Sequence, residues 1–216
     1  MTFTPAIDPD IEYPDSDGKP MTDNTEQYEW IVKIKENLEI LFANSPNVFI
    51  AGVLLWYPVQ DQKITEPVAT DVMVVFGRPK GRRSSYKQWQ EDNIAPQVVF
   101  EILSPSNSLE EMERKLLFYQ RYGVEEYYLY DPDSHNFQGW LRPEELLSSI
   151  PEIKGWFSPR LKIRFELRGD ELEIYSLDGQ KFLTSLELSQ RLEQERLKAE
   201  RLAEYIRSLG IDPDTL

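Results

Sequence analysis

The sequence predicts a domain of mixed α and β structure, because strand-like apolar runs are interleaved with amphipathic helical segments. Buried strands are indicated by the runs VFIAGVLLW, PVATDVMVVF and VVFEIL, at residues 48–56, 67–76 and 98–103. Helical periodicity marks residues 23–42 and 108–122, and a long polar helix follows at 183–209. We therefore expect an α/β (α+β) fold with a C-terminal helical extension.

Length and local composition divide the chain into three parts. With 216 residues it is long enough for one domain with extensions. Residues 1–22 are rich in acids and prolines, which indicates an extended N-terminal arm. We expect residues 23–182 to form the domain and residues 183–216 to form a polar helix and tail.

Composition excludes several classes of function. The chain has no cysteine and one histidine, which rules out disulfides, thiolate catalysis and multi-histidine metal sites. Any metal would be a hard, oxygen-liganded ion such as Mg²⁺ or Mn²⁺. The net charge of −14 argues against a general nucleic-acid coat protein. No run approaches the ~18 apolar residues of a membrane span and no signal peptide opens the chain, so we expect a cytoplasmic protein.

The first helix, at residues 23–42, presents one polar residue on its apolar face. Asp23 or Asn24 can cap its start. The apolar face comprises Trp30, Ile31, Ile34, Leu38, Leu41 and Phe42. At about 100° per residue Gln27 falls within this face. Gln27 is therefore expected to point inward.

Two of the apolar strand runs each carry one acid. Asp71 stands at the head of VMVVF, and Glu101 interrupts VVFEIL. A carboxylate within a sheet interior needs a partner, because burying a lone charge is costly. The two strands could pair side by side and bring both acids together.

The segment of residues 77–96 is the densest basic stretch of an acidic chain. Its cations are Arg78, Lys80, Arg82, Arg83 and Lys87, with Tyr86 and Trp89 adjacent. One interpretation is a solvated loop, and the other is a surface that contacts nucleic-acid phosphates with an aromatic ring for stacking.

The helix at 108–122 follows Glu101 and brings a base toward it. Ser108 is a suitable N-cap and Gly123 a suitable terminator. Met112, Leu116 and Tyr119 form the inward stripe, and Lys115 lies on or beside it. Lys115 and Glu101 are expected to share a polar pocket with each other, with water or with a metal.

The remaining segments predict further strands and a surface helix. Residues 126–130 and 136–141 are expected to form a hairpin around the turn at Asp131 to Asp133, and residues 161–167 and 172–175 alternate like edge strands. The thin apolar stripe of the helix at 183–209 indicates a packing strap or a helix-pairing device, through which a homodimer could form.

Asp71, Glu101 and Lys115 together suit metal-assisted phosphodiester hydrolysis. Two carboxylates hold Mg²⁺, the metal activates water, and the ammonium steadies the nucleophile or the pentavalent transition state. A purely structural ion pair is the alternative that the residues leave open.

Long motifs resemble a known family. These are TDVMVVF, YPDSDGKPMTDN, IRSLGIDPDTL and the stretch APQVVFEILSPSNSLEEMERKLLFYQRYGVEEYYLYDPDS. They resemble the Uma-two family of predicted bacterial endonucleases, within the restriction-endonuclease-like PD-(D/E)xK superfamily. The resemblance implies a mixed central sheet flanked by helices, a divalent metal, and nucleic acid, with DNA first, as substrate. It places the family's first acid on Asp71, after Thr70 rather than proline, and its second on Glu101.

The sequence departs from the superfamily pattern where a lysine is expected. Leu103 stands two residues after Glu101, so the resemblance implies that Lys115 supplies the ammonium from the next helix. It further implies the main-chain carbonyl of Ile102 as a metal ligand and Gln27 as an added polar residue. The alternative function is an inactive nuclease-fold module that binds nucleic acid or a protein partner.

Overall fold

The computed structural model describes residues 13–16, 18, 22–169, 171–210 and 212. The chain divides into two compact units, Met1–Phe182 and Leu183–Leu216.

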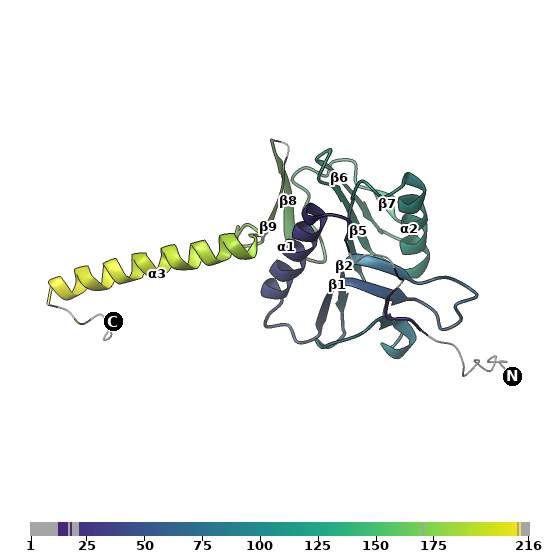
Figure 1. The fold of residues 1–216 in the computed structure, drawn as a ribbon, viewed down its shortest axis with the longest axis horizontal. Coiled ribbons are helices and arrows are strands. Elements are labelled where there is room, and N and C mark those ends of the chain that lie inside the picture. The colour runs from purple at the N-terminus through teal and green to yellow at the C-terminus, as the bar shows by residue number, and fades with distance from the viewer. Residues whose placement is uncertain (1–12, 17, 19–21, 170, 211, 213–216) are drawn as a thin grey trace. The chain divides into compact units, whose positions relative to one another are not determined.

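A seven-stranded mixed sheet forms the centre of the first unit (Figure 1). Its order is β3 (Tyr86–Lys87), β1 (Val48–Tyr57), β2 (Val68–Phe76), β4 (Val98–Ile102), β5 (Glu126–Asp131), β6 (Asn136–Leu141) and β7 (Ser148–Ser149). The β1–β3 and β4–β5 pairs are parallel, and the other pairs are antiparallel. The predicted pairing of the two acid-bearing strands, β2 and β4, is confirmed, as is the β5–β6 hairpin.

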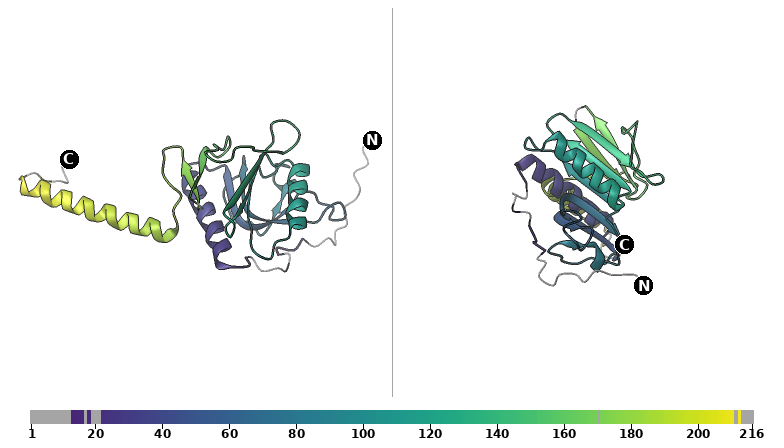
Figure 2. Two further views of the ribbon diagram at one scale, coloured as in Figure 1. Left: turned by 90° about the horizontal axis from the view of Figure 1, so that it is seen from above. Right: turned by 90° about the vertical axis from the view of Figure 1, so that its right-hand side faces the viewer.

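Helices cover both faces of this sheet, as the left-hand view of Figure 2 shows. Helix α1 (Thr25–Leu41) packs on the face that carries Val72, Val74 and Phe100. Helix α2 (Leu109–Tyr122) packs Phe118 and Tyr119 on the opposite face. The alternation along β2 and β4 therefore supplies two cores from the same strands. This confirms the predicted α/β class, with a mixed sheet flanked by helices.

Capping residues define where α1 and α2 begin. Asn24 accepts a hydrogen bond from the Gln27 amide at 2.7 Å, and Ser108 accepts one from the Glu111 amide at 3.1 Å. Each cap satisfies an amide that the first helical turn leaves unpaired. Helix α2 ends at Gly123, whose φ of +93° suits glycine.

Strands β8 (Ile163–Arg168) and β9 (Glu171–Ser176) form a separate two-stranded sheet. Their expected alternation is present, but they do not extend the central sheet. The reason is that Phe165, Leu172 and Ile174 pack against the core that α1 covers, so this hairpin acts as a cover. Strand β3 is also new, because it lies inside the segment that sequence patterns treat as a basic loop.

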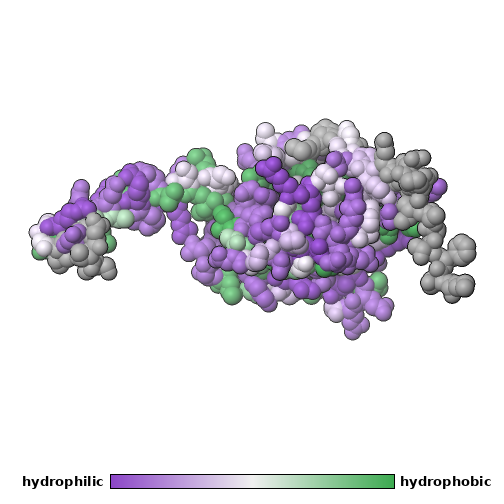
Figure 3. Space-filling model, turned by 90° about the horizontal axis from the view of Figure 1, so that it is seen from below, coloured by the Kyte–Doolittle hydropathy of each residue, from purple (hydrophilic) through white to green (hydrophobic). Residues whose placement is uncertain are grey.

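Helix α3 (Ser185–Ser208) contains no buried residue. A capping box of Thr184 and Glu187 fixes its start. Leu192, Leu197 and Leu202 are all exposed. Figure 3 shows hydrophilic side chains over much of this helix. Pairing of α3 with a second copy stays a prediction.

Within the described part of the chain, no helix combines the length and hydrophobicity that crossing a bilayer requires.

Candidate active site

Asp71 and Glu101 meet on the sheet face that α2 covers. The β2–β4 register pairs Val72 with Phe100 and Met73 with Val99. One further step along this register places Asp71 opposite Glu101, and alternation points both side chains toward α2. Sequence analysis predicted this meeting of two acids from separate strands.

Glu101 is a buried carboxylate with a partner on each oxygen. Its side chain is 2% exposed. The Lys115 ammonium donates to Oε2 at 2.7 Å, and the Tyr119 hydroxyl donates to Oε1. Both donors come from the inward face of α2, one turn apart, so the helix compensates the charge that the strand buries.

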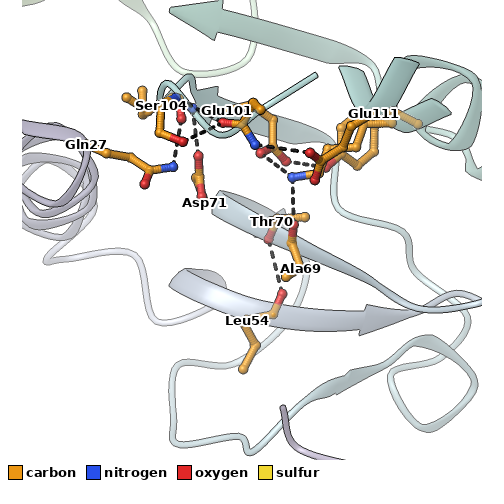
Figure 4. A network of polar contacts seen from close by, with 12 residues as sticks. Gln27, Leu54, Ala69, Thr70, Asp71, Glu101, Ser104 and Glu111 are labelled. Carbon is orange, nitrogen blue, oxygen red and sulfur yellow. Dashed lines mark hydrogen bonds and ion pairs between the residues drawn. The ribbon is translucent and has the colours of Figure 1, made fainter. Parts of the chain in front are cut away.

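Lys115 is held in the site by two hydrogen bonds, and Figure 4 shows the network of polar contacts around Ala69 and Glu101, which accept them. Besides Glu101, its ammonium donates to the main-chain oxygen of Ala69 at 3.1 Å. Burial by itself lowers the pKa of Lys115, but the carboxylates of Glu101 and Asp71 outweigh burial, and the net pKa is raised. Lys115 therefore stays cationic at neutral pH.

The surroundings of Asp71 compensate a negative charge on it only in part. Its Oδ2 accepts a hydrogen bond from the Ile102 amide at 2.7 Å. Burial, followed by repulsion from Glu101, raises the pKa of Asp71 to about 8, against smaller lowering effects from Lys115 and the Ile102 amide. With two acids and one ammonium, the site has a surplus of one negative charge when Asp71 is ionised.

Gln27 reaches the site from the opposite face of the sheet. Its side chain is buried and donates at 2.9 Å to the carbonyl oxygen of Ile102, the last residue of β4. Figure 4 shows the Gln27 side chain close to Asp71. The side-chain oxygen of Gln27 accepts a hydrogen bond from the main-chain amide of Asp23 at 2.9 Å. The Asp23 carboxylate in turn accepts from Ser104 at 2.6 Å. These bonds tie the start of α1 to the loop after β4.

A cleft of about 440 Å³ opens above these groups. Its lining includes the carboxylates of Asp15, Asp23, Asp71, Glu101 and Glu111 and the cations Arg114 and Lys115. The rim residues Ser106 and Arg114 are exposed, so the cleft reaches the surface. Asp71, Glu101 and Lys115 thus line a cleft that is open to solvent.

The donor set fits a hard divalent cation. Among the described residues no group of three or more acidic or histidine side chains is placed to share an ion. Asp71 and Glu101 would supply two carboxylates, and the Ile102 carbonyl, which has a second lone pair beside its bond to Gln27, would supply a main-chain oxygen. A bound cation would offset the negative charge that Asp71 acquires when it ionises.

The basic segment does not reach this cleft. Arg78 and Arg83 both bind Glu91, at 2.9 and 2.6 Å, and Lys80 binds Glu39 at 2.7 Å. None of the five predicted phosphate-binding cations lines the cleft. Arg78, Lys80 and Arg83 therefore have carboxylate partners. Sequence periodicity could not identify these partners.

The two other predicted cations, Arg82 and Lys87, lie outside these ion pairs. Lys87 places its ammonium 5.2 Å from the centre of the Tyr13 ring. Arg82 is exposed. The role of the whole basic segment in binding nucleic acid stays a prediction.

The structure adds two residues to the site that sequence analysis did not assign to it. Tyr119 was expected only as a core residue, yet its hydroxyl binds Glu101. Arg114 lines the cleft beside Lys115. The sequence signal that could have indicated Tyr119 is its position on the helix, since it follows Lys115 by one turn and faces the same way.

Comparisons with known proteins come to the same family as the motifs. No curated protein matches the chain significantly. One solved structure that matches is titled a "putative nuclease belonging to DUF820" from Anabaena variabilis ATCC 29413, with 16% identity, a TM-score of 0.47, and coverage of 63% of this chain and 73% of the other. The model of the Uma2 family, described as "Putative restriction endonuclease", matches residues 8–178. Because that match spans most of the sequence, this chain belongs to the Uma2 family.

Proposed function

We propose that the protein is a metal-dependent endonuclease that hydrolyses phosphodiester bonds of nucleic acid, with DNA as the expected substrate. The observation that carries this proposal is the convergence of Asp71, Glu101 and Lys115 in one solvent-accessible cleft. Structural ion pairs also bury charge, but they do not require an open cleft or a second, incompletely compensated carboxylate.

Asp71, Glu101 and the Ile102 carbonyl would hold Mg²⁺ or Mn²⁺. When bound, such an ion supplies a Lewis acid that lowers the pKa of a coordinated water and neutralises phosphate charge. Asp71 must lose its proton to act as a ligand, since its pKa is raised to about 8. Gln27 orients the Ile102 carbonyl by donating to it at 2.9 Å.

Lys115 acts through its charge rather than as a base. Its raised pKa keeps the ammonium protonated at neutral pH. The Ala69 carbonyl and Glu101 fix its position, so it requires little reorganisation when negative charge develops on the phosphoryl oxygens. Tyr119 holds the other Glu101 oxygen and so positions the carboxylate.

Arg114 is the cleft cation best placed to receive the substrate backbone. It is exposed at the rim and has no carboxylate partner within the described residues. Lys115, by contrast, is already paired with Glu101. Because carboxylates outnumber cations along the lining, we expect nucleic acid to bind well only when a divalent ion is present.

A cleavage assay tests this proposal. Purified protein is incubated with supercoiled plasmid, linear duplex and single-stranded DNA in Mg²⁺, Mn²⁺ or EDTA. We expect cleavage with a divalent ion, and its loss in Glu101→Gln. The matched control is Glu110→Gln, which alters an exposed acid on α2 and should cut normally. Equal cleavage by wild type and Glu101→Gln would identify a contaminating nuclease and refute the assignment.

The alternative of an inactive binding module makes a different prediction. It requires that wild type binds DNA yet cleaves none of the substrates in either metal. It also requires that calorimetry detects no Mn²⁺ binding to wild type or to Asp71→Asn.

A further inference from the structure

A second pocket lies beside the cleft, under the first turn of α2. Its volume is about 290 Å³, close to the lower end of the roughly 300–1,000 Å³ typical of ligand sites. It is lined by Leu103, Leu109, Met112, Leu129, Asn136 and Gln138, together with Asn107, Ser108 and Asp131. The pocket thus lies between the end of β4, the start of α2 and the β5–β6 hairpin.

The two pockets adjoin at the loop after β4. Asn107 lines both of them. Its side-chain oxygen accepts a hydrogen bond from the main-chain amide of Ser104 at 2.9 Å, and its side-chain nitrogen donates one to the Glu111 carboxylate at 3.2 Å. These bonds hold the shared wall in place. Leu103 lines the second pocket and lies two residues after Glu101 on the same strand. A substrate whose phosphate lies near Glu101 can therefore extend a neighbouring group into the second pocket.

One side of the pocket is apolar. Leu103 and Leu129 are partly buried, Met112 is buried, and Leu109 at the rim is 77% exposed. Leu103 occupies the place where the superfamily pattern has a lysine. Because this residue is leucine, it adds an apolar side chain to the wall of the pocket and no positive charge.

The opposite side presents two carboxamides. Asn136 and Gln138 project from the same face of β6, since they are two residues apart, and Gln138 lies opposite Leu129 in the β5–β6 register. Both side chains are exposed, and no described residue bonds to either amide. Each offers one donor group and one acceptor to a ligand.

The side-chain charge of the pocket disfavours an anion as its ligand. No lysine or arginine is among the described residues that line it, and Asp131 contributes a carboxylate. The Asp131 carboxylate is held by the Ser134 hydroxyl at 2.5 Å and the Asp133 amide at 3.1 Å. A phosphate would be repelled here. An uncharged, flat group with apolar faces and a polar edge is complementary.

We propose that this pocket holds an unpaired nucleobase of the substrate, next to the phosphate in the cleft. The inference rests on the proposed function and specifies its substrate class. Asparagine and glutamine carboxamides can bond base edges in pairs, and apolar side chains can contact base faces. Stacking in a duplex covers both faces of a base, so the apolar side chains can contact these faces only after the base leaves the stack. The preferred substrates are therefore single strands, flaps or junctions, or duplexes from which one nucleotide is extruded.

Binding of short single-stranded oligodeoxynucleotides tests the subsite without requiring cleavage. The probes carry 2-aminopurine or an abasic nucleotide at successive positions, and binding is measured by anisotropy in Ca²⁺ and in EDTA. We expect 2-aminopurine fluorescence to rise at one position as that base leaves its stack. An abasic nucleotide at that position should weaken binding about a hundredfold, because it removes two amide–base contacts worth about tenfold each.

Variants assign the effect to the pocket. Asn136→Ala and Gln138→Ala should each lower affinity for the intact oligonucleotide by about tenfold and leave affinity for the matching abasic one unchanged. Gln90→Ala removes an exposed glutamine elsewhere and serves as the matched control. Asn136→Ala and Gln138→Ala remove exposed side chains, so circular dichroism should show an unchanged fold.

The outcomes separate the subsite from the proposed function. DNA binding or cleavage that is insensitive to abasic nucleotides and to Gln138→Ala overturns the subsite and leaves the nuclease assignment standing. A wild-type protein that binds no oligonucleotide in either condition and cleaves none of the plasmid, duplex and single-stranded substrates overturns both.

Discussion

Replacing Asp71 with asparagine tests the surplus charge on which the metal site depends. Asparagine keeps an oxygen to accept the 2.7 Å bond from the Ile102 amide and removes only the ionisation. The pKa of Asp71 is about 8 in the folded protein against 3.8 for an unperturbed aspartate. The folded state therefore binds more protons than the unfolded state between these values.

The sign of the pH effect follows from this difference. A raised pKa contributes stability that is fully present below pH 3.8 and is lost as pH rises through about 8. For Asp71 this loss is at most about 1.4 kcal/mol per pH unit, and water in the open cleft screens part of it. The Asp71→Asn protein lacks this loss. Between pH 5 and 8 its stability should therefore rise relative to wild type by on the order of 2–4 kcal/mol.

Urea denaturation in EDTA at several pH values measures this difference. Asp133→Asn, which neutralises an exposed aspartate in the β5–β6 turn, is the matched control and should show no comparable trend. Added Mn²⁺ should stabilise wild type, increasingly with pH up to about 8, and leave Asp71→Asn unaffected. Parallel stability curves for wild type and Asp71→Asn would refute the reasoning, because they would show that Asp71 ionises without a folding cost.

Three further substitutions test the remaining groups of the cleft. Lys115→Met leaves the Glu101 carboxylate without its counter-ion. The free energy of unfolding, measured in urea, should therefore fall by about 3–5 kcal/mol, and cleavage should be abolished. An active, equally stable variant would contradict the electrostatic role of Lys115. Tyr119→Phe removes one hydrogen-bond donor to Glu101, so the free energy of unfolding should fall by about 1–3 kcal/mol and Mn²⁺ binding in calorimetry should weaken. Unchanged values would show that the hydroxyl does not position the acid. Arg114→Ala should reduce the slope of log affinity for DNA against log salt by about 0.9, and an unchanged slope would place the phosphate elsewhere.

Local patterns were sufficient to predict the centre of the site. Alternation along β2 and β4 placed Asp71 and Glu101 on strands that could pair, and helical periodicity turned Lys115 and Gln27 inward. These predictions succeeded because the direction of a side chain depends on the repeat of its own element. The pairing of β2 with β4 and the contact of Lys115 with Glu101 confirm the placement.

Partners that come from distant segments could not be predicted in this way. The density of cations between Arg78 and Lys87 suggested a nucleic-acid surface, yet Glu91 and Glu39 bind three of them. Strands β8 and β9 have ordinary edge-strand alternation, yet they cover a face of the sheet. Alternation shows which residues are buried but not which surface buries them.

The sequence by itself determined the fold class, the family motifs and the inward direction of the site residues, because these depend on composition and on periodicity within single elements. Only the tertiary structure decided which charges meet, that a cleft opens over Asp71 and Glu101, and that Asn107 stands between this cleft and a second pocket. The physical reason is that an ion pair or a cavity is a property of surfaces brought together by packing. Its residues can be far apart along the chain, as Gln27 and Ile102 are.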